Sequence, residues 1–210
     1  MSNLIHNSPN SKTNIVVLIT HSLSEMDVLL PIFSEITLAH NVHIELIFAV
    51  RTIYRQYQQS AFYRHCCRKL DVKVSYHLLP NKFDTGFRFF LFNRFGRFPI
   101  KGFFLLLRLI QYARCFTTLH AASILLHEFS NQTLSTSILY RIQKKYATPI
   151  WVYDHGHAIR LDQNTGKMIE DSDRVTLLNF HEHNHTTFSN LGFKKQTIIG
   201  YSKFYPQWEK

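Results

Sequence analysis

A short segment at residues 149–160 combines an apolar run with reactive side chains. Its first part, Ile-Trp-Val-Tyr, is rich in β-branched and aromatic residues, which is typical of a buried strand. The segment continues directly into Asp154, His155, Gly156 and His157. Imidazole has an ordinary pKa close to neutrality, so a histidine that emerges at the end of a strand can act as a general base. We therefore expect a catalytic or substrate-binding role for His155, the alternative being that its ring only donates to a backbone carbonyl.

Three other apolar runs of the chain also lead into histidines, which are His21, His127 and His181. If the strands before these histidines run parallel, their ends share one edge of a sheet, and ligands bind at that edge in open α/β folds. The alternative is that the imidazoles only bond to backbone carbonyls. The residues expected to contact the substrate are His21, His127, Glu128, Asp154, Gly156, His157, Arg160, His181 and Tyr201.

Histidine is also a metal ligand, and the run from His181 to His185 contains three imidazoles and Glu182. This run follows one predicted strand and precedes a predicted helix, where side chains diverge, and no spaced cysteine pair accompanies it. We therefore predict no metal site, and a metal-dependent hydrolase is the weakest alternative function.

The sequence also lacks the usual signs of a nucleotide cofactor. The turn after residues 14–20 reads His-Ser-Leu-Ser, without the spaced glycines of a dinucleotide site or a P-loop. A nucleophilic serine elbow is missing as well. We therefore predict that no cofactor binds to this chain itself.

Apolar runs alternate with segments of helical periodicity along most of the chain. Strands are expected at residues 14–20, 42–50, 72–79, 123–126, 150–153, 175–180 and 197–199, and helices at about 24–40, 54–70, 130–146 and 186–191. Such alternation implies right-handed crossovers and parallel strands. The sequence predicts a Rossmann-like α/β domain, with a mostly parallel sheet of six to seven strands and helices on both faces.

Basic residues are concentrated in one part of the chain. The 210 residues carry a formal net charge of +10, and residues 82–114 hold seven basic side chains against one acid. The surrounding tract, residues 82–116, is rich in phenylalanine and is interpreted as a basic aromatic insertion. Phenylalanine at the acyl boundary and arginine at the head groups suit an anionic membrane surface. The residues expected to contact a membrane are Arg88, Arg94, Arg97, Phe98, Lys101, Phe103 and Phe104.

Two other interpretations of this tract stay open. Its aromatic residues could stack on single-stranded nucleic acid, or they could be ordinary core residues with the arginines as a solvated rim. We favour the membrane because the apolar part of the tract has no base-reading groups, so nucleic acid is not the expected partner. The longest uncharged stretch of the tract is too short to span a bilayer.

The remaining composition indicates the compartment. Residues 1–12 are polar, rich in serine and asparagine, and are expected to form a disordered leader. Three cysteines provide neither a disulfide framework nor metal-ligand spacing. We expect a cytoplasmic protein that can bind peripherally to the inner face of the cell membrane.

With these elements placed, the order of segments resembles the N-terminal, acceptor-side domain of GT-B glycosyltransferases. It is especially similar to bacterial capsule and teichoic-acid enzymes of the CDP-glycerol glycerophosphotransferase type and to related epimerase-like transferases. The His155-Gly156 pair resembles the His-Gly that such enzymes place facing the acceptor. Residues 173–201 resemble the family's strand, glycine-terminated helix and strand, which lead here into Gly200-Tyr201-Ser202-Lys203.

The resemblance implies that His155 activates a glycan or lipid-linked acceptor for surface polysaccharide synthesis. After His-Gly this chain has His157-Ala158-Ile159-Arg160, where glycerophosphotransferases have Thr-Pro-Leu-Lys, which favours a sugar donor over a polyol phosphate. By the same resemblance, residues 13–203 form the acceptor-side domain and residues 204–210 begin an interdomain linker. The second domain, which would hold the nucleotide sugar, is expected to be absent, so the chain alone would be inactive. The alternative is a non-catalytic domain that binds anionic lipid or nucleic acid.

Overall fold

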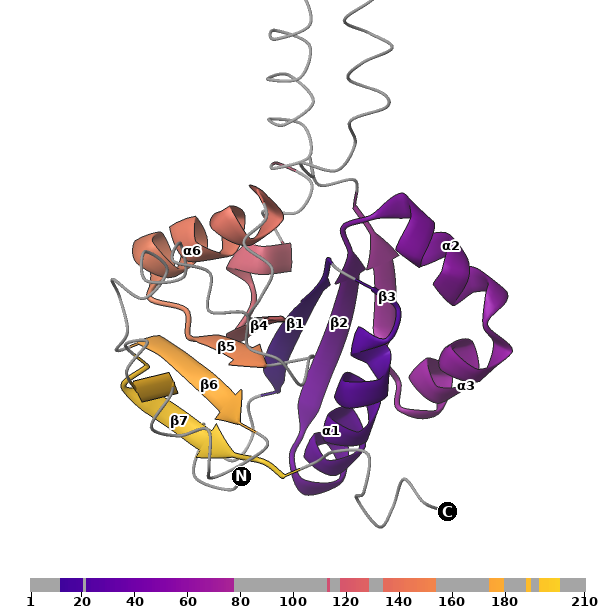
Figure 1. Ribbon diagram of the computed structural model, residues 1–210, viewed down its shortest axis with the longest axis horizontal. Helices are drawn as coiled ribbons and strands as arrows, with labels where there is room; N and C mark the ends of the chain where they lie inside the picture. Colours follow the sequence, from indigo (N-terminus) through magenta and orange to yellow (C-terminus); the bar gives the residue numbers. More distant parts are fainter. Residues whose placement is uncertain are drawn as a thin grey trace, which may run out of the picture.

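The centre of the protein is a seven-stranded sheet (Figure 1). The computed structural model describes residues 12–20, 22–77, 113, 118–128, 134–153, 174–179, 188–189 and 193–200. The strands are β1 (Thr13–Ile19), β2 (Val42–Phe48), β3 (Lys73–Tyr76), β4 (Ile124–Glu128), β5 (Ile150–Tyr153), β6 (Val175–Asn179) and β7 (Lys195–Ile198). The helices are α1 (Glu25–Ala39), α2 (Arg51–Gln59), α3 (Ala61–Lys69) and α6 (Leu134–Tyr146).

The sheet follows the order β3-β2-β1-β4-β5-β6-β7, and every neighbouring pair is parallel. This arrangement confirms the predicted Rossmann-like α/β class and the larger of the two expected strand numbers. The strand order reverses between β1 and β4, which makes that pair the topological switch point of the sheet. In open α/β sheets, ligands bind in the crevice outside the carboxyl ends of the strands at this point.

Two hydrophobic layers cover the two faces of the sheet. Ile15, Val17 and Ile19 of β1 belong to one core cluster together with residues of α1, α2 and α3. Val16 and Leu18 belong to a second cluster, which includes residues of α6. Because both faces are buried, β1 can be apolar at nearly every position, as parallel strands commonly are.

The segment expected as one helix at residues 54–70 is two helices in the structure, α2 and α3. Ser60 separates them with an extended backbone, at φ −79° and ψ 109°. Its hydroxyl oxygen accepts a hydrogen bond from the Tyr63 N–H at 3.3 Å. Serine is a favoured helix N-cap, so this side chain starts a second helix where periodicity alone predicts one continuous helix.

One further strand boundary differs from its prediction, and several predicted segments lie outside the described residues. Strand β4 was expected to end before His127, but it continues through Glu128. The basic aromatic tract, apart from single described positions, lies outside the described residues, as do residues 1–11 of the expected leader and the expected linker at 204–210. None of the helices in the described part of the chain combines the length and apolar character needed to cross a membrane.

Candidate functional site at the carboxyl edge of the sheet

The strands that precede the predicted site residues all end at the same edge of the sheet. Strands β1 and β4, β4 and β5, and β5 and β6 are parallel neighbours. Because parallel strands deliver their carboxyl ends to one edge, the last residues of β1, β4, β5 and β6 lie along that edge. The shared edge that the histidine pattern requires is therefore present, and it includes the switch point between β1 and β4.

A buried glutamate connects two of these strand ends. Glu25, the first residue of α1, is completely buried. Its Oε1 accepts hydrogen bonds from the backbone N–H groups of Thr20 and Ser22, at 3.2 and 3.0 Å. Its Oε2 accepts a hydrogen bond from the Tyr153 hydroxyl at 2.6 Å. The carboxylate thus holds the turn after β1 against the end of β5.

The position of Glu25 suits a buried negative charge. The N-terminus of an α-helix carries a partial positive charge, and a carboxylate there is stabilised by it. Three hydrogen-bond donors replace the water that the carboxylate loses on burial. A buried charge is tolerated when it is matched in this way, and the three bonds fix the side chain in one geometry.

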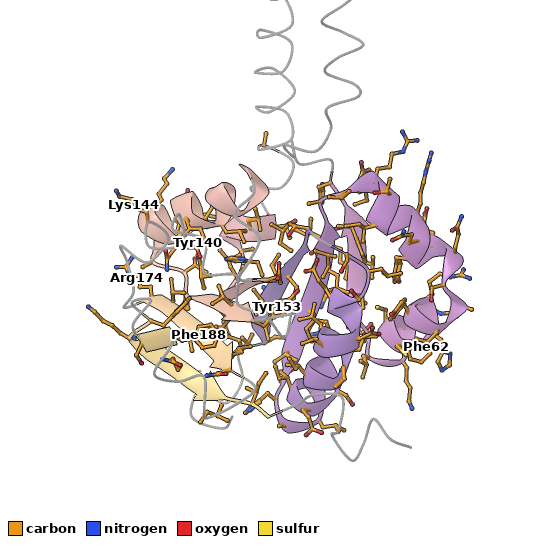
Figure 2. The ribbon with its side chains drawn as sticks, in the orientation of Figure 1. Phe62, Tyr140, Lys144, Tyr153, Arg174 and Phe188 are labelled. Carbon is orange, nitrogen blue, oxygen red and sulfur yellow. The ribbon has the colours of Figure 1, made fainter. Side chains whose placement is uncertain are left out.

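Tyr153 lies between two carboxylates at the end of β5. It is paired in register with Glu128 of β4, and its hydroxyl bonds to Glu25. Both the tyrosine and Glu128 are buried. Burial raises the pKa of Tyr153 well above its ordinary value, and the negative charges of Glu25 and Glu128 raise it further. The phenol therefore keeps its proton and acts as a donor; Figure 2 labels it near the centre of the molecule.

His127 lies on the other face of the sheet from Glu128, as successive residues of a strand do. It is completely buried and packs edge to face against Tyr140 of α6. Its Nδ1 donates to the Glu128 carbonyl at 2.8 Å, so its Nε2 accepts from the Tyr140 hydroxyl at 3.2 Å. Burial lowers the pKa of His127 to about 4, which keeps the ring neutral at pH 7.

The structure therefore separates two residues that were expected to share one substrate site. Glu128 lies on the face that carries Tyr153 and Glu25, whereas His127 packs beneath α6. The bond from His127 to the Glu128 carbonyl is of the kind expected if the imidazole has only a structural role. A role of His127 in substrate binding stays a prediction. The predicted residues that lie outside the described part of the chain are His21, Asp154, His155, Gly156, His157, Arg160, His181 and Tyr201.

Although His21 is not described, both of its sequence neighbours are. Thr20 and Ser22 each donate a backbone hydrogen bond to Oε1 of Glu25. Likewise, Asp154 and His155 follow Tyr153 directly in the sequence, and Tyr153 bonds to Oε2 of the same glutamate. One carboxylate thus anchors the chain beside two of the predicted site segments.

Sequence reasoning missed Glu25 and Tyr153. A signal for the first was present, because Ser22-Leu23-Ser24-Glu25 matches the capping-box spacing in which an acidic side chain bonds back to a backbone N–H. The structure contains that bond, from the Ser22 N–H to Glu25. Tyr153 had a weaker signal: it is the one residue with a hydroxyl in an otherwise apolar strand.

A second polar region lies toward the amino ends of the first strands. A cavity of about 290 Å³ is lined by Asn14, Ile15, Val16, His43, Glu45, Lys73, Thr118 and Ala121. Within it, Lys73 Nζ lies 3.0 Å from Glu45 Oε2, and the Ser75 hydroxyl donates to Glu45 Oε1 at 3.2 Å. Parallel α/β sheets bind ligands at the opposite edge, so this cavity is not the first candidate for the site.

Neither region assembles a metal site from the residues that the structure describes. No group of three or more His, Cys, Asp or Glu side chains within those ranges could hold a metal ion. The described part of the carboxyl edge offers carboxylates, a phenol and backbone amides. The Glu25 carboxylate and the Tyr153 phenol are buried and bonded to each other, so they hold this edge in place rather than contact a ligand directly.

Searches with family models and against curated proteins found no match. Among solved structures, Glycyrrhiza uralensis UGT73P12 in complex with glycyrrhetinic acid 3-O-monoglucuronide aligns with a TM-score of 0.52 and 12% identity. The alignment covers 93% of this chain and 50% of that one, so the chain spans about half the length of this neighbour.

Two further structures align with lower scores. The glycotransferase of kitacinnamycin has a TM-score of 0.43 and 11% identity, over 91% of this chain and 52% of that one. Phytolacca americana UGT2, complexed with UDP-2fluoro-glucose and pterostilbene, has a TM-score of 0.37 and 13% identity, over 68% and 29%. At such identities the likeness to the first structure establishes the fold alone, which is that of a Rossmann-like α/β domain.

Proposed function

We propose that this chain provides the acceptor-binding half of a nucleotide-sugar-dependent glycosyltransferase that acts in surface polysaccharide synthesis. The observation that carries the proposal is the convergence of the carboxyl ends of β1, β4, β5 and β6 at one edge, next to the switch point. The alignment with about half of a larger glycosyltransferase supports the same reading.

In this proposal the acceptor binds at the carboxyl edge and His155 removes the proton from its attacking hydroxyl. Histidine is the side chain that most often serves as a general base in enzymes. His21, Glu128 and the other predicted contacts, except His127, which is buried beneath α6, orient the acceptor through hydrogen bonds. Glu25 and Tyr153 are positioning residues, because they bond to each other and to the backbone beside the predicted site segments.

The proposal assigns the nucleotide-sugar donor to a second α/β domain outside this chain. Lipid-linked acceptors lie at the membrane, so the proposal also includes peripheral binding at the inner face of the cell membrane, through the basic aromatic tract. The closer kinship to glycerophosphotransferase-type capsule and teichoic-acid enzymes belongs to the proposal as well, and it rests on the His155-Gly156 and Gly200-Tyr201 patterns.

Ligand-observed NMR on the purified chain tests the acceptor assignment. The probes are short soluble oligosaccharides of glucose, galactose, N-acetylglucosamine and rhamnose, with UDP-glucose as the donor probe. We expect saturation transfer to at least one oligosaccharide and none to UDP-glucose. Substitutions His155→Ala and His21→Ala should remove the oligosaccharide signal, whereas His65→Ala, on the exposed side of α3, should preserve it.

A transfer assay provides the complementary result. Sugar transfer should need a supplied donor domain, so sustained turnover of a nucleotide sugar by the isolated chain would contradict the assignment of this chain as the acceptor half. An oligosaccharide signal that survives both histidine substitutions would contradict the location of the site at the carboxyl edge.

A further inference from the structure

Helices α2 and α3 form a basic surface that lies apart from the aromatic tract in the sequence. Residues 51–70 contain five arginines or lysines and no aspartate or glutamate. The five are Arg51, Arg55, Arg64, Arg68 and Lys69, and all are exposed. We call these five residues, together with Phe62, the α2–α3 face. It carries half of the formal net charge of +10, which makes it a second centre of positive charge.

The opposite sides of both helices are fixed to the core. Ile53 and Tyr57 of α2 and Cys67 of α3 are buried in the same hydrophobic cluster as α1. The Tyr63 hydroxyl donates to Asp27 of α1 at 2.7 Å, which ties α3 to its neighbour. Burial, and to a lesser extent the bond to Asp27, raises the pKa of Tyr63 to about 12. The hydroxyl therefore keeps the proton of this hydrogen bond at physiological pH. The basic side chains therefore project from a fixed platform.

The two helices that carry these cations contain no acidic residue, and the nearest acid in the sequence is Asp71, two residues after Lys69, whose backbone N–H donates to the Arg68 carbonyl at 3.2 Å. Asp27, on the adjoining helix, accepts the Tyr63 hydroxyl. Arg64 and Arg68 place their Nε atoms 3.3 Å from the backbone carbonyls of Ser60 and Arg64, so these side chains run along the helix. The ion pair found among the described residues, Lys73 with Glu45, involves none of the five cations. Their charge is available to an external anion.

A large apolar side chain lies on the same helix as three of these cations. Phe62 of α3 is 56% exposed, and Figure 2 shows it at the outer margin of α3, away from the sheet. Phenylalanine between arginines and lysines on a helical surface is the pattern of interfacial membrane binding: the ring enters the acyl boundary and the cations meet anionic head groups. Stacking on the bases of a single-stranded nucleic acid instead requires several aromatic platforms along a groove, and the exposed rings of α2 and α3 are those of Phe62 and His65.

We propose that the α2–α3 face binds the surface of an anionic phospholipid bilayer. Helix α2 begins three residues after the end of β2, so its first turn lies at the carboxyl edge of the sheet. Binding through this face brings that edge close to the bilayer. The inference does not depend on the aromatic tract, and it holds whether or not the proposed acceptor chemistry is correct.

Vesicle flotation of the full chain tests this proposal. The probes are vesicles of phosphatidylcholine alone and of phosphatidylcholine mixed with phosphatidylglycerol. The double substitution Arg55→Glu/Lys69→Glu should weaken binding to the anionic vesicles by about tenfold or more, because each basic residue near such a surface contributes several-fold. The matched control is Lys12→Glu/Lys144→Glu, which makes the same change in net charge at exposed positions elsewhere. Lys144 lies in the last turn of α6, as Lys69 lies in that of α3.

The control double variant should retain most of its vesicle binding, and Phe62→Ser should weaken binding while leaving the net charge unchanged. Equal losses in the two double variants would overturn the proposal, because net charge alone would then explain the binding. Unchanged binding in Arg55→Glu/Lys69→Glu would overturn it in favour of another surface. A single-stranded oligonucleotide serves as a further probe. If Arg55→Glu/Lys69→Glu lost binding to the oligonucleotide but kept its vesicle binding, the proposal would be overturned and the face assigned to nucleic acid. Soluble oligosaccharide binding should be the same in all of these variants, which separates this test from that of the acceptor site.

Discussion

Two of the three buried glutamates in the described part of the chain, Glu25 and Glu45, are stabilised in different ways. Glu25, at the carboxyl edge, accepts two backbone N–H groups and the hydroxyl of a fully buried tyrosine. Glu45, in the middle of β2, pairs with Lys73, whose side chain is 58% exposed, and with the Ser75 hydroxyl. The partners of Glu25 are held by the backbone and the core, whereas a partner of Glu45 can move into solvent. The carboxyl edge is therefore the more rigid of the two polar regions, as a binding site requires.

The largest effect in this comparison is expected from Glu25→Ala. The substitution leaves two backbone N–H groups and the Tyr153 hydroxyl without an acceptor inside the protein. It should lower the free energy of unfolding by about 3–5 kcal/mol. Urea denaturation followed by the fluorescence of buried Trp151 measures this change. Glu35→Ala, at a half-buried position of the same helix, is the control, and a similar loss in both variants would contradict the role given to Glu25.

The second effect is a loss of stability in acid that arises from His127. Its pKa is about 4 in the folded protein, because of burial, against 6.5 for an ordinary histidine. The unfolded chain therefore binds the proton first, and stability falls as the pH drops below about 6.5 until the pH reaches about 4. The difference corresponds to about 3 kcal/mol.

Urea denaturation between pH 4 and pH 7 measures the contribution of His127. Substitution His127→Gln should reduce the slope of stability against pH in this range, whereas His65→Gln, at an exposed position, should leave it unchanged. A wild-type slope that persists in His127→Gln would assign the acid sensitivity to other groups.

A smaller effect is expected from Tyr153→Phe, which removes the side-chain donor among the described hydrogen bonds to Glu25. The loss should be about 2 kcal/mol, since one oxygen of a buried carboxylate is left without its partner. The pKa of Tyr153 is raised, so the folded protein keeps this proton when the unfolded chain loses it above about pH 10, and stability falls there. Tyr153→Phe should make that alkaline fall shallower, and Tyr146→Phe, at a half-buried position of α6, is the matched control.

The smallest effect is expected at the second glutamate. Lys73→Met removes an exposed cation from a pair that solvent screens, so the free energy of unfolding should change by less than about 1 kcal/mol. Added salt should reduce even this difference. A loss as large as that of Tyr153→Phe would show that the two regions are equally rigid and would remove the contrast between them.

The sequence was sufficient to predict the fold class because long apolar runs have few alternatives. Residues 14–20 and 150–153 are apolar at nearly every position, as strands covered on both faces must be. The predicted end of β4 was wrong because His127 and Glu128, although polar, lie inside the strand. Their burial depends on Tyr140 and Tyr153, which are distant partners that a local pattern does not reveal.

The candidate site was predictable only in part for the same reason. Parallel strands were enough to place several strand ends at one edge. The bond from Tyr153 to Glu25 joins residues 128 positions apart, so it follows from the order of the strands and the placement of α1 rather than from any motif. The helix break at Ser60 was missed because the helical periodicity of residues 54–70 continues across it. The break depends on one serine hydroxyl, which accepts a hydrogen bond from the Tyr63 N–H.

The backbone amide resonances of the protein test the location of the binding site most directly. Titration with the oligosaccharide that gives the strongest saturation-transfer signal should shift the amides of Thr20, Ser22 and Glu128, which lie beside the switch point. The amides of His43, Glu45 and Lys73 should keep their positions. Shifts confined to these three residues, around the cavity of about 290 Å³, would contradict the account and place the ligand at the other polar region.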